Sequence, residues 1–295
     1  MLNTLLGAER LRLYVWASLV SQILIVVTGG AVRLTGSGLG CPTWPECEAG
    51  SYSTVPELGM HGIIEFANRL LTFVLLIVAI LTYLTVIRLS NSEKTGLVWP
   101  SFALGMGIVA QAILGGITVL TGLNAWIVGA HFLVSALLIG IATVLVWRFY
   151  GQWSFAASES SQHLSVVIFP VGILAIIIGV IVTGSGPHAG DADTPRNGLN
   201  SDLLVHIHSY PAYLLLGLVL LQTLLYFRSS TTPKFAKTTS LVFLGILALQ
   251  AGVGILQARI GLPVGLVALH MFGASVLASM LTCQLLITRN LLHKK

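Results

Sequence analysis

Charged side chains are scarce in this sequence of 295 residues. Asp, Glu, Lys and Arg make up 8% of the chain, whereas hydrophobic residues make up 55% and the mean hydropathy is +0.91. Because roughly a quarter of the residues in a soluble globular domain are charged, this composition excludes a soluble globule. No basic stripe alternates with aromatic residues outside the apolar runs, so the sequence gives no support for nucleic-acid binding.

Eight apolar runs account for this composition, and each is close to the roughly 20 residues that a bilayer-spanning helix needs. The runs cover residues 13–32, 62–87, 99–120, 126–147, 164–183, 204–227, 239–258 and 264–288. We predict an all-α, polytopic protein of the cell membrane, with eight helices in contact with lipid. The first run lacks a small-residue cleavage site after its apolar part, so we expect a retained helix and not a signal peptide.

A repeat joins the two halves of the chain. At a constant offset of 139, five residues recur: Gln111/Gln250, Gly115/Gly254, Gly122/Gly261, Leu123/Leu262 and His131/His270. The tetrapeptide Thr-Gly-Ser-Gly also follows the first apolar run of each half, at 35–38 and 183–186. We predict two pseudo-symmetric four-helix bundles, 1–150 and 164–295, joined by a cytoplasmic linker, 151–163. An even number of helices per copy gives both copies one orientation, so we expect an axis along the membrane normal to relate them.

Basic residues predict the orientation of the helices. Eleven of the fifteen Lys and Arg fall on one side of the membrane, and the other side has only Arg33, Arg69, Arg196 and Arg259. By the positive-inside rule both termini are then cytoplasmic. The starts of the even-numbered helices consequently lie toward the extracytoplasmic side.

Only three cysteines occur. Cys41 and Cys47 share the first extracytoplasmic loop, where thiols oxidise, and the five residues between them include two prolines. We expect a disulfide, with two free thiols as the alternative. A metal site is disfavoured because no further Cys or paired His lies at ligand spacing. Cys283 stands alone in an apolar run, where we expect a small core residue.

The second helix begins with four polar side chains within nine residues: His61, Glu65, Asn68 and Arg69. Spacings of four and seven residues put the first three on one helix face. Because a carboxylate inside a membrane protein is a functional candidate by default, we expect Glu65 to belong to a buried site. The alternatives are a helix start wetted by the membrane surface, with Arg69 reaching outward, and a loop position for His61.

Histidines near the extracytoplasmic side suggest a metal cofactor. His131 and His270 share one depth in the repeat, and an offset of 140 aligns His208 with Asn68. His206 lies two residues from His208, so the two point to different helix faces. Two imidazoles from facing helices suit the axial positions of a haem iron. His208 and His270 then form a complete pair, whereas His131 faces Asn68.

Two further features lie on the same side. Arg69 and Arg259, with the Gly-rich turns, are candidate hydrogen-bond donors to haem propionates. The Gly-, Pro- and Asp-rich segment 186–196, which contains His188, is either an ordered lid over an adjacent site or a solvated turn. The sequence leaves both interpretations open.

Three motifs carry a family resemblance: Gly-Gly-Ala-Val-Arg-Leu-Thr-Gly-Ser-Gly-Leu-Gly-Cys-Pro-Thr-Trp-Pro-Glu-Cys at 29–47, Glu-Phe-Ala-Asn-Arg at 65–69 and Thr-Gly-Ser-Gly-Pro-His-Ala-Gly-Asp at 183–191. With the histidines they resemble haem A synthase, the cytochrome oxidase assembly enzyme, over essentially the whole chain. The resemblance implies an oxidoreductase that binds haem b in the C-terminal half. In the N-terminal half it would oxidise a methyl group of haem O to a formyl group by successive hydroxylations.

Carried over by position, the resemblance implies a set of site residues. The iron ligands would be His131 for the substrate haem, and His208 and His270 for haem b. Glu65 would be the essential carboxylate, and the extracytoplasmic disulfide is implied again. The partners would be haem O, the enzyme that produces it and an unidentified electron acceptor, and the sequence allows a homo-oligomer. The alternative function is a di-haem b electron-transfer protein without porphyrin chemistry.

One residue departs from the family pattern. Many members have a histidine three residues after the glutamate, where this chain has Asn68. Asn is a poor iron ligand. We therefore expect the iron in the N-terminal half to be five-coordinate on His131, with ligation by His61 or looser binding as the alternatives.

Overall fold

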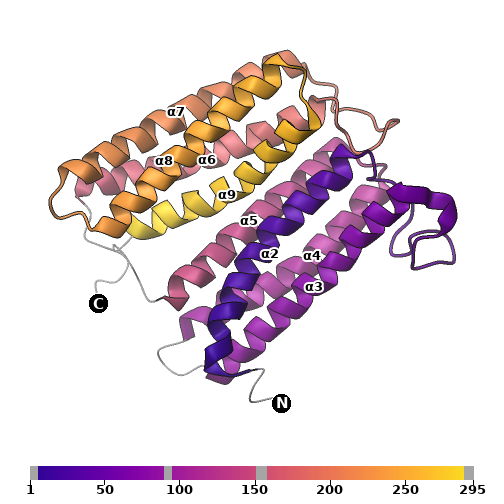
Figure 1. Ribbon diagram of the computed structural model, residues 1–295, viewed down its shortest axis with the longest axis horizontal. Coiled ribbons are helices and arrows are strands. Elements are labelled where there is room, and N and C mark those ends of the chain that lie inside the picture. Colours follow the sequence, from indigo (N-terminus) through magenta and orange to yellow (C-terminus); the bar gives the residue numbers. More distant parts are fainter. Residues whose placement is uncertain (1–5, 90–94, 151–157, 289–295) are drawn as a thin grey trace. The chain divides into compact units, whose positions relative to one another are not determined.

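The computed structural model describes residues 6–89, 95–150 and 158–288, most of which are helical (Figure 1). The helices are α2 (Ala8–Leu34), α3 (Gly59–Leu89), α4 (Val98–Leu120), α5 (Ala125–Phe149), α6 (Glu159–Ser185), α7 (Ser201–Arg228), α8 (Lys234–Arg259) and α9 (Val264–Thr288), with short 3-10 turns η1 (Pro56–Leu58) and η2 (Thr95–Leu97). Within these ranges there is no β-strand, and eight helices are long and apolar enough to cross a membrane. The predicted all-α membrane fold is confirmed.

The helices extend beyond the apolar runs that predict them. Helix α6 begins at Glu159, inside the predicted linker, and α3 begins at Gly59, before the predicted run. The added turns are polar, and hydropathy does not report helix in polar sequence. The first seven residues of the predicted linker, 151–157, lie outside the described residues.

The chain divides into two compact units. Unit 1 contains Met1–Phe149 and Val180–Ser201, and unit 2 contains Tyr150–Gly179 and Asp202–Lys295. In unit 1 each helix from α2 to α5 packs on the next, and α5 closes back on α2 (Figure 1). Helices α3 and α5, which carry Glu65 and His131, are therefore diagonal across this bundle.

In unit 2, helices α6 to α9 form the second bundle (Figure 1). Gly172 of α6 leaves space that the Leu281 side chain of α9 fills. Deeper in the bundle, Gln284 Nε2 donates hydrogen bonds to Tyr226 Oη at 3.4 Å and to Ser165 Oγ at 3.5 Å. These contacts tie α6, α7 and α9 together and leave the histidine-bearing ends of α7 and α9 in the same bundle.

The repeated Gly-Leu pair ends one helix and starts the next in the same way in both units. Gly122 and Leu123 have φ values of 59° and 58°, and Gly261 and Leu262 have values of 81° and 57°. Each leucine N–H donates to the carbonyl oxygen five residues earlier at 2.8 Å, which closes the preceding helix. Because left-handed backbone is costly for leucine, the shared conformation shows that the repeat includes backbone geometry as well as residue type.

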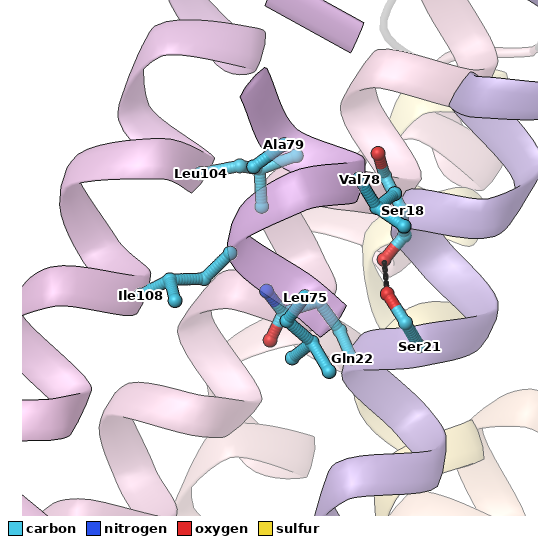
Figure 2. A pocket seen from close by; sticks show the side chains of 8 residues that line it. All are labelled: Ser18, Ser21, Gln22, Leu75, Val78, Ala79, Leu104 and Ile108. Atoms are coloured by element: carbon cyan, nitrogen blue, oxygen red, sulfur yellow. Dashed lines mark hydrogen bonds between the residues drawn. The ribbon is translucent and has the colours of Figure 1, made fainter. Parts of the chain in front are cut away.

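Polar side chains of α2 line the middle of unit 1 (Figure 2). Ser18 and Gln22 are buried there, and Ser18 Oγ lies 3.1 Å from Thr82 Oγ1 of α3. Leu75 of α3 and Ile108 of α4 complete the apolar side of the same small pocket. None of its eight lining residues is ionisable.

Candidate functional site

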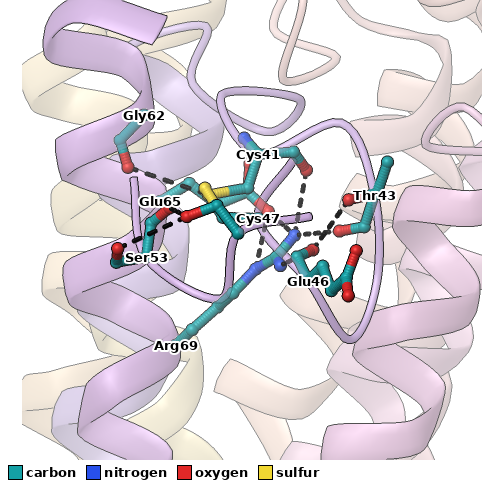
Figure 3. The surroundings of a disulfide bond; sticks show 9 residues. Cys41, Thr43, Glu46, Cys47, Ser53, Gly62, Glu65 and Arg69 are labelled. Carbon is teal, nitrogen blue, oxygen red and sulfur yellow. Dashed lines mark hydrogen bonds and ion pairs between the residues drawn. A yellow bond between two sulfur atoms is a disulfide. The ribbon is translucent and has the colours of Figure 1, made fainter. Parts of the chain in front are cut away.

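The segment 41–47, here called the disulfide loop, lies over the start of α3 (Figure 3). Cys41 and Cys47 are buried and joined in a disulfide, with an S–S distance of 1.99 Å, as the sequence predicts. The ring of Trp44 covers Gly116 of α4 so closely that a Cβ atom there would lie 2.3 Å from the ring. The disulfide loop is therefore fixed to two helices of unit 1.

The guanidinium of Arg69 is enclosed by the disulfide loop (Figure 3). Its Nη2 donates to the carbonyl oxygens of Cys41 at 2.9 Å and Thr43 at 3.0 Å, and its Nη1 donates to that of Glu46 at 3.1 Å. A guanidinium has five N–H donors in fixed directions and can hold several carbonyls at once, which a lysine ammonium cannot match. The sequence predicts that Arg69 donates hydrogen bonds to a haem propionate. In the structure its Nη1 and Nη2 groups donate instead to backbone carbonyls of the disulfide loop.

Glu65 is buried, with 6% of its surface exposed. Its Oε2 accepts a hydrogen bond from the backbone N–H of Cys41 at 2.6 Å. Its Oε1 accepts from Arg69 Nε at 3.1 Å and from Arg69 Nη2 at 2.6 Å. A carboxylate offers about four acceptor positions. Three donors therefore leave one position, on Oε2, for a further group.

His131 lies near the start of α5, in the same unit as Glu65. Its Cε1 is 3.3 Å from where a Cβ of Gly115 would lie, so that glycine makes room for the imidazole. Gln111 of α4 donates to the backbone oxygen of His131 at 3.0 Å and to Ser135 Oγ, which holds α5 against α4. His131 Nδ1 is buried and has no hydrogen-bond partner among the described residues.

Unit 2 brings two histidines together. The rings of His208 on α7 and His270 on α9 have centroids 6.3 Å apart and planes at 84°. A Cβ atom added to Gly254 would lie 3.3 Å from His270 Cε1, which repeats the arrangement of Gly115 and His131. A Cβ atom added to Gly179 would lie 2.9 Å from His208 Cε1. In the described part of the chain neither Nδ1 has a hydrogen-bond partner, although both are buried.

The geometry of this pair fits a metal between the rings. Two metal–nitrogen bonds of about 2 Å each, on opposite sides of one ion, separate the imidazole centroids by about 6 Å. The centroids of His208 and His270 are 6.3 Å apart. Gly179 and Gly254 make room for the two imidazoles, since a Cβ atom at either position would press on the neighbouring ring. The residues present therefore fit a haem iron with two axial imidazoles.

Asn68 occupies, on α3, the place that the repeat gives to His208 on α7. Its Oδ1 is buried without a hydrogen-bond partner in the described ranges. His61, one of the alternative ligands, has its Nδ1 2.9 Å from Ser37 Oγ, and Ser37 is fully buried in the turn after α2. His61 thus joins α3 to that turn.

Three other basic side chains that the sequence singled out lie elsewhere. His206 is exposed and its Nδ1 lies 2.8 Å from the backbone oxygen of Asp202 on its own helix. Arg259 is exposed at the last residue of α8. His188 lies in the segment 186–200, which follows α6.

That segment packs on unit 1. The backbone N–H of Gly38 donates to the Gly190 oxygen at 2.7 Å. The Leu123 side chain contacts both glycines. The segment 186–200 therefore packs on unit 1 at Gly190, whereas Pro187, Asp193 and Arg196 remain exposed.

A family model described as "Cytochrome oxidase assembly protein" matches residues 12–282, which is nearly the whole chain. The chain belongs to this family. Relatives named "Heme A synthase" include one from Lysinibacillus sphaericus, 35% identical over 46% of this chain and 43% of its own length, and one from Alkalihalophilus pseudofirmus, 25% identical over 95% and 98%. A third, from Shewanella oneidensis, is 26% identical over 88% and 91%. The chain spans about half the length of the first curated relatives it matches, 43% and 54%.

The sequence pattern does not predict two contacts of this chain. Gln111 was visible as a repeated residue, but the repeat did not reveal that it holds the backbone of His131. The hydrogen bond between the Gly38 N–H and the Gly190 oxygen had only an indirect sequence signal, the Thr-Gly-Ser-Gly tetrapeptide that recurs at 35–38 and 183–186. Both contacts join different helices or loops, whereas periodicity reports only structure within one element.

Proposed function

We propose that this chain is a haem A synthase, an oxidoreductase that converts a methyl group of haem O to a formyl group by successive hydroxylations. One observation carries the proposal. The same histidine and glycine arrangement recurs in both units, as His131 with Gly115 and His270 with Gly254, but among the described side chains a buried carboxylate, Glu65, accompanies it only in unit 1. A duplicated haem site with a carboxylate in one copy suits one cofactor haem and one substrate haem.

The cofactor site would be in unit 2. His208 and His270 would hold the iron of haem b from both sides, and the 6.3 Å between their ring centroids supports this assignment. Haem b supplies one-electron transfer when bound. A haem iron held by His208 and His270 would suit electron transfer and not the oxidation of a substrate haem.

The substrate site would be in unit 1. His131 would bind the iron of haem O, while Glu65 would face the reacting methyl group through the acceptor position that remains on Oε2. A carboxylate fixed by Cys41 N–H and Arg69 does not need to reorganise when positive character develops beside it. It would also orient an incoming water molecule. The disulfide loop would limit access of bulk water from above Glu65.

The expected surroundings follow from the topology. Both termini would be cytoplasmic and both haem sites would lie toward the extracytoplasmic side, where the disulfide is expected. The partners would be membrane lipids, the enzyme that supplies haem O and an electron acceptor that the chain does not identify.

The test is to purify the chain from cells with and without a haem O source, extract the haems and separate them by chromatography. We expect haem b in both samples, and haem O and haem A only when the source is present. A di-haem electron carrier would yield haem b alone in both samples. That result would refute the proposed chemistry while leaving the histidine sites intact.

A further inference from the structure

Asn68 is the position at which the two candidate haem sites differ most directly. An offset of 140 aligns it with His208, whose ring centroid lies 6.3 Å from that of His270. His131 keeps the position of His270, and each ring lies beside a glycine at which an added Cβ atom would be 3.3 Å from Cε1. Unit 1 therefore repeats one half of the histidine pair and replaces the other half with a carboxamide.

The carboxamide has an unmet hydrogen-bonding requirement. Asn68 Oδ1 is buried, and no group among the described residues donates to it. A buried carbonyl without a donor is destabilising, so such an atom indicates a ligand that supplies one. A carboxamide accepts through Oδ1 and donates through Nδ2, but it binds iron poorly. It suits a group that hydrogen-bonds to a small molecule beside the metal.

The neighbouring polar residues of α3 are engaged elsewhere. His61 Nδ1 lies 2.9 Å from Ser37 Oγ, at the turn after α2. Glu65 accepts hydrogen bonds from the Cys41 N–H and from Arg69. Asn68 is therefore the α3 side chain at the position where unit 2 has its second imidazole.

We propose that Asn68 lines an open coordination position of the substrate haem iron, where its Oδ1 accepts a hydrogen bond from a water molecule that carbon monoxide can replace. His131 binds the same iron from the other side. This inference rests on the proposed function and deepens it, because it assigns the exchangeable position to unit 1. In unit 2, His208 and His270 occupy both axial positions, so the same ligand has no place to bind.

The experiment uses the haem-loaded full chain, reduced with dithionite and exposed to carbon monoxide. We expect one of the two haems to bind the gas, and His131→Ala to remove that haem while sparing the other. In Asn68→His an imidazole fills the position and carbon monoxide binding is lost. In Asn68→Leu, which has similar size but no N–H, binding remains and the C–O stretching frequency rises. The reciprocal change, His208→Asn, gives the second haem the ability to bind carbon monoxide.

Each outcome decides one claim. A wild-type protein that contains both haems but binds no carbon monoxide overturns the inference and leaves the proposed function standing. An unchanged C–O stretch in Asn68→Leu also overturns it, because the amide is then not beside the ligand. His61→Ala is the matched control and leaves both binding and stretch unchanged. If no haem O or haem A is recovered from wild-type protein supplied with haem O, the proposed function itself fails.

Discussion

Units 1 and 2 start from the same repeat and differ in what surrounds it. Unit 2 brings two imidazoles together, with centroids 6.3 Å apart and ring planes at 84°. Unit 1 keeps His131 but adds a buried carboxylate, Glu65, which Arg69 and the disulfide loop hold in place. The duplicated helix bundle therefore keeps a histidine at the same place in both copies and holds a buried carboxylate under a loop in one of them.

The largest effect should come from breaking the complete pair. In His270→Ala the unit 2 iron would lose one of two axial ligands, and even changes beside a metal ligand weaken affinity by about 10- to 100-fold. We expect haem b in the purified protein to fall below about a tenth of the wild-type content. The pyridine haemochrome assay measures it. His206→Ala is the control, because the His206 ring bonds to its own helix, and this variant should keep the full haem b content. Retention of haem b in His270→Ala would show that His270 does not hold the iron of unit 2.

The next effect concerns the carboxylate that only unit 1 has. Glu65→Gln keeps the size of the side chain and removes the charge, so haem O should still bind. Loss of one preorganised electrostatic group typically costs about 10²- to 10³-fold in rate. We expect haem A formation to fall by that factor, measured by chromatography of extracted haems over time.

The control for this variant is Glu57→Gln, which changes an exposed carboxylate in η1. It should form haem A at the wild-type rate. A wild-type rate in Glu65→Gln would show that the carboxylate serves the loop and not the reaction. Unit 1 would then differ from unit 2 in architecture alone.

The sequence predicted the parts of this comparison that depend on local pattern. The eight helices followed from apolar run length, and the repeat located His131 and His270 at matching places on α5 and α9. It also aligned the Gly-Leu turns, which adopt the same left-handed backbone, although the backbone angles themselves were not predicted. Residue spacing is sufficient for these features because each depends on neighbours within a few turns.

The sequence did not predict the tertiary contacts that distinguish unit 1 from unit 2. Arg69 was expected to reach a propionate or the membrane surface, and its N–H groups bond instead to carbonyls of the disulfide loop. Backbone carbonyls carry no sequence signal, so no pattern could reveal this acceptor set. The same holds for Gly190, whose oxygen accepts from the Gly38 N–H across 152 positions of the chain.

A smaller effect should follow from loosening the disulfide loop. Arg69→Lys retains the charge but not the fork of N–H groups that holds three loop carbonyls. Since each hydrogen bond to a charged group contributes about 1.5–3 kcal/mol, the loop should open at least about tenfold more often. We expect dithiothreitol to reduce the Cys41–Cys47 bond faster by that factor, measured by alkylation and mass spectrometry. Arg259→Lys, at an exposed helix end, is the matched control, and equal reduction rates in both variants would contradict this reading of Arg69.

The smallest effect should separate the two left-handed leucines. Leu123 and Leu262 have φ values of 58° and 57°, so glycine would relieve about 1–2 kcal/mol of backbone strain at either position. Leu123 is 7% exposed and packs on Gly38 and Gly190, and removing such a side chain costs about 1.5–3 kcal/mol. Leu262 is only partly buried, so it loses less.

Leu123→Gly should therefore destabilise the protein by about 1 kcal/mol, whereas Leu262→Gly should be close to neutral, because strain relief and lost packing nearly cancel. Thermal unfolding followed by circular dichroism measures both variants against the wild type. The contrast depends on segment 186–200 packing against Leu123 in unit 1. Equal effects at the two positions would show that this packing contributes nothing to stability, and the units would then differ only in the residues around their histidines.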